Sequence, residues 1–151
     1  MSAKIHSLSD YISDDDLVAI PEGVYQLSYR HHATWLYMGR FPKVVVTFRI
    51  ADMGEHFDKP ILAYYNPSEI IGKPRKNGHF TAGWRSRLMW DYAICFGKPA
   101  RKDRISMCRF KEHLVVGKVR TVTHNRDQKA YPDGLTYSVV GELLGLSLIH
   151  I

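Results

Sequence analysis

Residues 43–50, KVVVTFRI, are the strongest β-strand signal in the chain. One apolar face is formed by Val44, Val46, Phe48 and Ile50, and polar residues alternate with part of it. This period of two is typical of a strand with one buried face, and its β-branched and aromatic residues favour the extended conformation. The segment therefore predicts a strand at the centre of a sheet-based fold.

Further strands are predicted on both sides of this segment. Pro21, Glu22 and Gly23 introduce residues 24–29, which alternate as a half-buried strand does. Residues 30–42 contain Gly39 and Pro42 and are predicted as a loop-like stretch. After a turn over residues 52–58, residues 60–66 predict a third strand. Three strands in sequence joined by loops indicate an antiparallel meander.

The second half of the chain adds one helix and two more strands. Residues 72–79 hold two glycines, a proline and three cations, and predict an exposed loop or hairpin tip. Apolar residues then recur at helical spacing over residues 84–96, before Gly97 and Pro99. A short helical turn is predicted over residues 105–110 and strands over 114–124 and 135–140, with Gly117 as a possible bulge.

The resulting order is β-β-β-α-β-β, a mainly β fold with one helix. Five strands with a helix between the third and fourth are the order of an OB-like five-stranded barrel. The alternative is a small α+β antiparallel sheet packed on the helix. We expect a single domain over residues 20–145, preceded by a flexible acidic arm over residues 1–19.

The last six residues, LSLIHI (146–151), are similar to the translation of an adapter used in sequencing libraries. On this interpretation native sequence ends near Gly145, and residues 146–151 are left out of the fold prediction. The alternative is a genuine short apolar strand or helix end.

The charge of the chain is concentrated in its middle. The formal net charge is +6 and the sequence pI is about 9.4. Residues 59–129 carry 16 basic and 5 acidic side chains, whereas the segments before and after them are net acidic. Such a basic block attracts polyanions or acidic surfaces. It predicts a surface that contacts nucleic acid by releasing counterions from phosphates.

Basic and aromatic residues supply the candidate binding site. Stacking of bases on aromatic rings is the second component of single-strand recognition. Trp35 and Tyr37 lie in the predicted loop, and one of the adjacent Tyr64 and Tyr65 must face away from the core, with Tyr65 as our choice. The predicted phosphate contacts are Lys73, Arg75, Lys76, Arg85, Arg87, Lys118 and Arg120.

The layout of residues 20–140 carries a resemblance. IPEGVYQLSYRHHATW (20–35), KVVVTFRI (43–50), PILAYYN (60–66), a basic linker, one helix and GKVRTVTHN (117–125) resemble single-stranded-DNA-binding proteins of phages and mobile elements. The opening strand of that family also follows a Pro-x-Gly turn, and a Gly-Lys strand also follows its helix. The resemblance implies an OB fold and DNA, rather than RNA, as the partner. The acidic C-terminal tail common in that family is missing here.

Enzyme and metal chemistry have little support in the sequence. It contains no phosphate-binding loop, no His-Glu-x-x-His and no nucleophile elbow, and its two cysteines are too few for a disulfide scaffold. We therefore expect a non-enzymatic protein without cofactor or metal. No signal peptide or membrane span is visible, which predicts a cytoplasmic protein that contacts no membrane.

The function predicted from the sequence is binding of single-stranded nucleic acid with little sequence preference. A nuclease or recombination protein is a further candidate partner. The oligomeric state stays open. A second hypothesis is a mobile-element inhibitor of the anti-CRISPR or anti-restriction type, which docks on a nucleic-acid-handling enzyme. A third is a nuclease with a dispersed acidic site at Asp52, Glu55 and Asp58.

Overall fold

A computed structural model describes residues 18–122 and 137–150, with the backbone alone for 149 and 150. The predicted acidic arm, apart from Val18 and Ala19, lies outside the described residues, as do residues 123–136 between and at the ends of the last two predicted strands.

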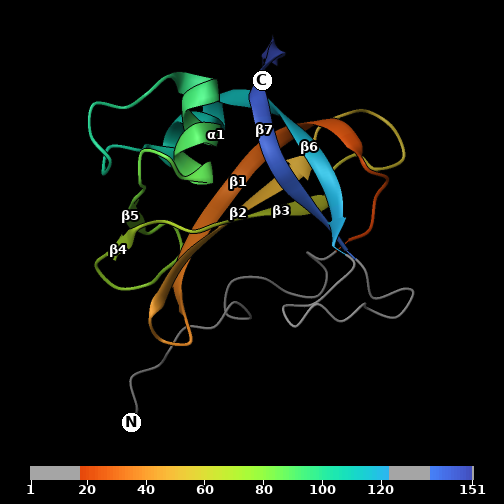
Figure 1. Ribbon diagram of the computed structural model, residues 1–151. Coiled ribbons are helices and arrows are strands. Elements are labelled where there is room, and N and C mark those ends of the chain that lie inside the picture. Colours follow the sequence, from red (N-terminus) through yellow and green to blue (C-terminus); the bar gives the residue numbers. More distant parts are fainter. Residues whose placement is uncertain (1–17, 123–136, 151) are drawn as a thin grey trace.

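Five strands form the main sheet: β1 (Gly23–Tyr37), β2 (Phe41–Ile50), β3 (Pro60–Tyr65), β6 (His113–Val122) and β7 (Tyr137–His150). β1 pairs antiparallel with β2, and β2 with β3, so the predicted meander is confirmed. The strands form a strongly curved sheet, and α1 lies at one side of it (Figure 1). The prediction of a mainly β fold with one α-helix is therefore confirmed for the described residues.

The strand order is β1-β2-β3-β7-β6, and β6 also pairs with β1. The fourth long strand, β6, thus lies beside the first, so the first four long strands have the spatial order 4-1-2-3 of a Greek key. β7 pairs antiparallel with β6 along most of its length. Its contact with β3 is parallel and consists of the single pair Leu62 and Val139, the narrowest link in the sheet.

β1 is much longer than the strand predicted over residues 24–29. The stretch 30–42, predicted as loop-like, is strand except for the turn at residues 38–40. The pairing with β2 shifts between Tyr29 and His31, which marks a β-bulge. The extra residue breaks the alternation on which the sequence prediction depended. It also decides that His32, beyond the bulge, lies opposite Val46, which belongs to the main core.

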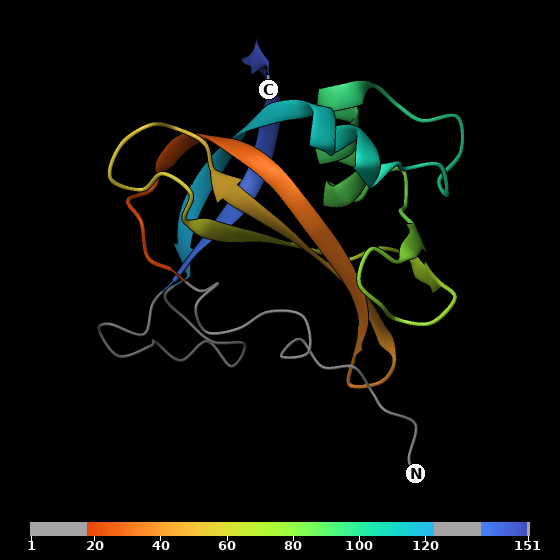
Figure 2. The same cartoon turned by 180° about the vertical axis from the view of Figure 1, so that it is seen from behind.

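A small hairpin, β4 (Glu69–Ile71) and β5 (His79–Thr81), confirms the hairpin predicted around residues 72–79. Its loop is docked on β1. The Thr34 amide donates to the Arg75 carbonyl at 3.0 Å, and the Asn77 amide donates to the His32 carbonyl at 2.6 Å. Figures 1 and 2 both show the hairpin beside the half of β1 that β6 leaves unpaired.

The helix α1 (Arg87–Phe96) begins three residues later than predicted, because Ser86 is its N-cap and its hydroxyl accepts a hydrogen bond from the Met89 amide at 3.1 Å. Its buried face includes Leu88, Met89 and Tyr92. A 3₁₀ helix over Met107–Glu112 replaces the short helical turn predicted at 105–110. In the part of the chain described, no helix is long and apolar enough to cross a membrane.

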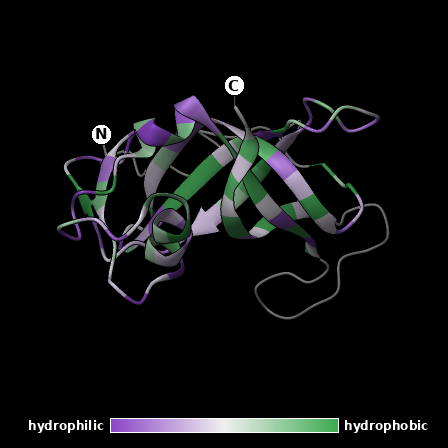
Figure 3. Cartoon of the chain, turned by 90° about the horizontal axis from the view of Figure 1, so that it is seen from above, coloured by the Kyte–Doolittle hydropathy of each residue, from purple (hydrophilic) through white to green (hydrophobic). Residues whose placement is uncertain are grey.

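Two hydrophobic clusters lie on opposite faces of the β1–β2–β3 sheet. The main core includes Val44, Val46, Phe48 and Ile50, as the alternation of residues 43–50 predicts. Figure 3 shows hydrophobic residues along the strands and hydrophilic ones in many of the connections. A smaller cluster on the other face consists of Ala33, Trp35, Val45 and Leu62, with Tyr64 packed against it.

The C-terminal strand β7 continues through residues 146–150. Leu146 lies opposite Val115 and packs on the main core, so residues 146–150 belong to β7 under either interpretation of their origin. Gly117 permits close packing here, because a Cβ atom at this position would lie 2.5 Å from the Leu27 Cδ1 atom. Val115 and Val119 are buried on either side of it, while extra residues in β7 shift the pairing nearby.

Candidate nucleic-acid interface

The face of β1, β2 and β3 that points away from the main core carries the candidate site, and we call it the outer face. Residues paired across antiparallel strands project to the same side of a sheet. Register pairs place Tyr37 opposite Phe41, Trp35 opposite Lys43, and Val45 opposite both Ala33 and Tyr64. Aromatic and basic side chains from three strands therefore share one surface.

The turn between β1 and β2 presents the exposed part of this surface. The Phe41 side chain is 46% exposed, and the Arg40 guanidinium carbon lies 4.9 Å from the centroid of its ring. The Tyr37 and Phe41 ring centroids are 6.5 Å apart at an interplanar angle of 32°. Met38 and Gly39 form the turn with positive φ angles. Two rings and one guanidinium thus gather at the tip of the hairpin.

Two lysines extend the outer face on either side of the rings. Lys43 Nζ donates a hydrogen bond to Asn66 Oδ1 at 2.6 Å, at the end of β3. Lys76 forms an isolated bridge with Ala33. The backbone bonds of Thr34 and Asn77 flank this pair, the pattern that brings opposite side chains closest together. Lys76 therefore projects on the same side as Ala33, that is, on the outer face.

Trp35 lies on the outer face but is not open to a base. Its exposed fraction is 7%, and it belongs to the small cluster with Ala33, Val45 and Leu62. The ring therefore supports the surface from below, whereas Tyr37, Phe41 and Tyr64 lie nearer to solvent. Trp35 and Tyr37, the two stacking residues predicted in this stretch, therefore lie on the same face, but Trp35 is buried and Tyr37 is half-buried.

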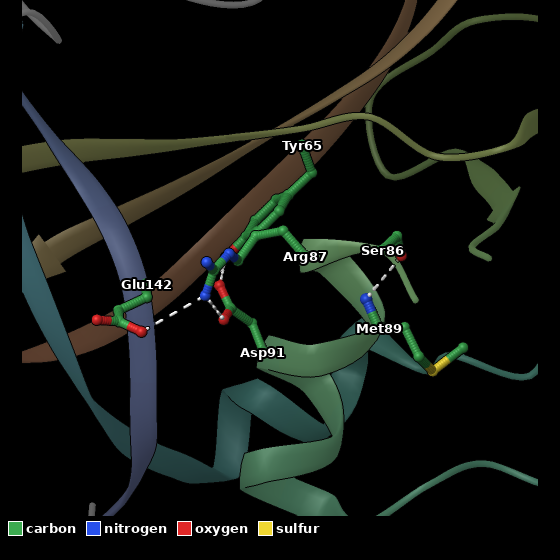
Figure 4. Close-up of polar contacts among 6 residues, drawn as sticks. All are labelled: Tyr65, Ser86, Arg87, Met89, Asp91 and Glu142. Atoms are coloured by element: carbon green, nitrogen blue, oxygen red, sulfur yellow. Dashed lines mark hydrogen bonds and ion pairs between the residues drawn. The ribbon is translucent and has the colours of Figure 1, made fainter. Parts of the chain in front are cut away.

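The choice of Tyr65 as a stacking residue is wrong. Tyr65 is buried in the main core, and its hydroxyl donates a hydrogen bond to Asp91 Oδ2 at 2.7 Å (Figure 4). Burial raises the pKa of Asp91 above its usual value, while the bond from Tyr65 and the charge of Arg87 oppose that rise. Tyr64, the other member of the pair, is the one on the outer face.

Arg87 and Arg85 lie at the start of α1, away from the rings of the outer face. Arg87 Nη1 is 3.8 Å from Asp91 Oδ1 and 3.4 Å from Glu142 Oε2, as Figure 4 shows. Two carboxylates therefore already offset its charge, and we no longer count it among the phosphate contacts. Arg85 is exposed in the turn before the helix.

The remaining predicted cations divide between two places. Lys73, Arg75 and Lys76 are exposed on the loop of the β4–β5 hairpin beside β1. Lys118 and Arg120 are exposed on β6, where Lys118 pairs with Val24 on one side and Glu142 on the other. β6 is not adjacent to β2 or β3 in the strand order. These predicted phosphate contacts therefore lie on two separate basic surfaces.

The acidic residues considered for a nuclease site do not converge. Asp52 accepts hydrogen bonds from the backbone amide and side chain of Gln26, at 2.9 and 3.1 Å. Asp58 lies 3.4 Å from Arg30 and 3.8 Å from Arg49, so it has basic partners that the sequence did not indicate. Within residues 18–122 and 137–150, no three His, Cys, Asp or Glu side chains are placed to hold a metal ion.

Sequence reasoning missed three residues of this surface as site residues: Arg40, Phe41 and Lys43. Neither Arg40 nor Phe41 is among the predicted contacts, and Lys43 is predicted only as the start of a strand. The signal that could have found them is Gly39, because tight hairpin turns require positive φ angles and therefore favour glycine. A comparison with protein-family models, with curated proteins and with solved structures finds no match to this chain.

Proposed function

We propose that this protein binds single-stranded nucleic acid with little sequence preference through the outer face of β1, β2 and β3. DNA is the preferred partner because of the resemblance to single-stranded-DNA-binding proteins of phages and mobile elements. We further propose that the sheet is an OB-like barrel. The phosphate contacts come from Arg40, Lys43 and Lys76, and the stacking rings from Tyr37, Phe41 and Tyr64.

The strand order supports the fold part of the proposal. A Greek key of four strands, with a fifth strand between the third and fourth, agrees with the five-stranded, partly open OB architecture. OB domains bind oligonucleotides on the face of their second and third strands and in the loop between the first and second. The outer face of β2 and β3 and the turn at residues 38–40 are the equivalent positions here.

The observation that carries the proposal is the group of Tyr37, Arg40 and Phe41 at the β1–β2 turn. An exposed phenyl ring with a guanidinium 4.9 Å from its centroid offers a flat surface for a base and a cation for the adjacent phosphate. Stacking of one base on a ring contributes about 1–3 kcal/mol and tolerates any base, because every base has a π face. This chemistry suits a single strand better than a duplex, whose bases are already stacked.

The first experiment is an anisotropy titration of a fluorescein-labelled oligothymidylate at several salt concentrations between about 50 and 200 mM. We expect the logarithm of the affinity to fall linearly with the logarithm of the salt concentration, by about 0.7 for each phosphate contact. A duplex of the same length should bind more weakly. Binding without salt dependence, or tighter binding to the duplex, would contradict the proposal.

Matched variants test the position of the site. Phe41→Ala should weaken binding by about 5- to 150-fold, the equivalent of one stacked base. Phe57→Ala is the control, because Phe57 is 50% exposed in the β2–β3 connection, at the opposite end of β2. Arg40→Ala should lower the salt slope by about 0.7, whereas Lys118→Ala on β6 should leave it unchanged. Equal effects of the Arg40 and Lys118 substitutions would reject the outer face as the site.

One observation favours the alternative, an inhibitor that docks on a nucleic-acid-handling enzyme. Trp90 and Ile94 are 62% and 44% exposed and lie four residues apart on α1, so they share one side of the helix. Exposed apolar groups of this kind are common at protein interfaces. Absence of oligonucleotide binding at low salt would favour this alternative over our proposal.

A further inference from the structure

A pocket of about 430 Å³ lies on the side of the hairpin loop away from the outer face. Its walls come from β1, the end of the hairpin loop and the segment that leads into the 3₁₀ helix. The volume falls in the range of about 300–1,000 Å³ usual for small-molecule sites. All of its lining residues belong to the described part of the chain, and the proposed oligonucleotide site uses none of them.

A fixed polar pair lies at the pocket wall. His32, 6% exposed, has Nε2 2.7 Å from the Gly78 carbonyl oxygen and Nδ1 2.8 Å from the Tyr29 hydroxyl. A carbonyl oxygen can only accept, so Nε2 carries the hydrogen and donates it, and the Tyr29 hydroxyl donates to Nδ1. Burial is the largest effect on the pKa of His32 and lowers it, which keeps the ring neutral near pH 7.

Two cations from different segments lie beside this pair. Lys111 on the 3₁₀ helix and Arg104 before it line the pocket and are exposed, as is His79 at the start of β5. In the described part of the chain, neither Arg104 nor Lys111 forms an ion pair. The one carboxylate at the pocket, Asp103, is held by Arg101 at 2.8 Å. The pocket therefore offers net positive charge to an anion.

The remaining lining is apolar and partly aromatic. Phe80 is buried and meets the His32 ring edge-on, with centroids 5.8 Å apart. Ile105 and Met107 line the same pocket. Small-molecule sites commonly combine such an apolar wall with a few polar and charged groups that orient the ligand. A ligand that fits both parts has an anionic end and a compact ring.

We propose that this pocket binds a phosphate monoester joined to a nucleoside, with Arg104 and Lys111 on the phosphate and the apolar wall against the rest. Arginine and lysine together suit a dianionic phosphate group, since both carry charge and several N–H donors. The ligand is either a free mononucleotide or the phosphorylated end of a strand, because both present the same group. The proposal does not depend on oligonucleotide binding at the outer face.

The test uses the full chain and measures thermal stabilisation and heat of binding with thymidine monophosphate and with thymidine. The monophosphate should raise the melting temperature in a concentration-dependent way, as a ligand of the folded state does, and bind at least about tenfold more tightly than thymidine. The double variant Arg104→Ala/Lys111→Ala should lose this difference. Lys118→Ala, which removes one exposed charge from β6, is the control and should bind as the wild type does.

A pair of oligonucleotides with and without a 5′-phosphate identifies the source of the ligand. Tighter binding of the phosphorylated oligonucleotide, abolished in the double variant, assigns the pocket to strand ends, and a response to the free monophosphate alone assigns it to mononucleotides. Equal affinities for thymidine monophosphate and thymidine would overturn the proposal. So would an unchanged affinity for the monophosphate in the folded double variant. Failure of the outer-face variants to affect oligonucleotide binding bears on the first proposal and not on this one.

Discussion

The buried bond between Tyr65 and Asp91 allows a quantitative prediction about how α1 is held against the sheet. Tyr65→Phe removes one oxygen atom and leaves the ring in the core. The Asp91 carboxylate, 1% exposed, then loses its bond at Oδ2 and keeps the weaker support of the Leu143 backbone and of the Arg87 guanidinium, 3.8 Å from Oδ1. The variant therefore leaves a buried acceptor, charged when ionised, without its main donor.

The size of the effect follows from the kind of bond. A hydrogen bond to a charged group contributes about 1.5–3 kcal/mol to the free energy of unfolding, and a neutral one about 0.5–1.5 kcal/mol. For a domain of this length, a loss of about 1.5–3 kcal/mol lowers the melting temperature by roughly 3–12 °C. Tyr25→Phe is the control, because the Tyr25 hydroxyl donates to the Pro21 carbonyl at an exposed site. We expect a loss below about 0.5 kcal/mol there.

The loss should depend on pH with a definite sign. The raised pKa of Asp91 means that the folded protein holds this proton more tightly than the unfolded chain does. The stabilisation from protonated Asp91 is present below the unfolded pKa and is lost as the pH rises through the folded pKa. Because an ionised carboxylate needs the Tyr65 donor more than a neutral one, the cost of Tyr65→Phe should grow as the pH rises through that window.

Urea unfolding followed by circular dichroism, at acid and neutral pH, measures both quantities. Asp91→Asn should remove the pH dependence and keep an acceptor for the Tyr65 hydroxyl. In the double variant Tyr65→Phe/Asp91→Asn the losses should not be additive, since the residues share one bond. Additive losses, or a Tyr65→Phe cost that is equal at both pH values, would refute this account of the bond.

Two further predictions concern packing and charge. Gly117→Ala should lower the free energy of unfolding by about 1–3 kcal/mol, because the new Cβ atom meets the Leu27 side chain at 2.5 Å; Gly83→Ala, with no atom within 4 Å, is the matched variant for thermal melting, and similar losses in both would show that the contact relaxes freely. Three exposed cations lie on the hairpin loop: Lys73, Arg75 and Lys76. Changing all three to Ala should lower the oligonucleotide affinity while the melting temperature stays nearly constant. A large fall in melting temperature would instead assign a structural role to these side chains.

The parts of the fold that sequence predicted well are those with regular alternation or helical spacing. β2 and α1 lie within three residues of their predicted bounds, because the residues that each contributes to the main core recur at the spacing of a strand or of a helix. β1 was predicted too short for a physical reason. Its bulge interrupts the alternation after Tyr29, and the polar pair His31 and His32 that follows is typical of an exposed loop. His32 is buried because Tyr29 and Gly78 satisfy its ring nitrogens, a contact that no local pattern indicates.

The choice between Tyr64 and Tyr65 had the same limit. Ile61, Ala63 and Tyr65 form one apolar face of β3, while Leu62 and Tyr64 form another, so the alternation does not identify the core side. Tyr65 is fixed inside by Asp91, which lies 26 residues later in the chain. All seven predicted cations are exposed, but their division among β6, the hairpin loop and the start of α1 depends on how the strands are ordered.

The docked hairpin loop has a consequence for how copies of this protein behave toward one another. Beyond Ser28, where β6 leaves it, the free edge of β1 is bridged only at Ala33 in the described part of the chain. An uncovered strand edge is a template on which another chain can add a strand. The loop over residues 72–78 covers part of this edge, and we therefore expect it to hinder pairing between the β1 strands of two copies. Shortening it should yield dimers or larger aggregates joined edge to edge, even if the core of each copy remains intact.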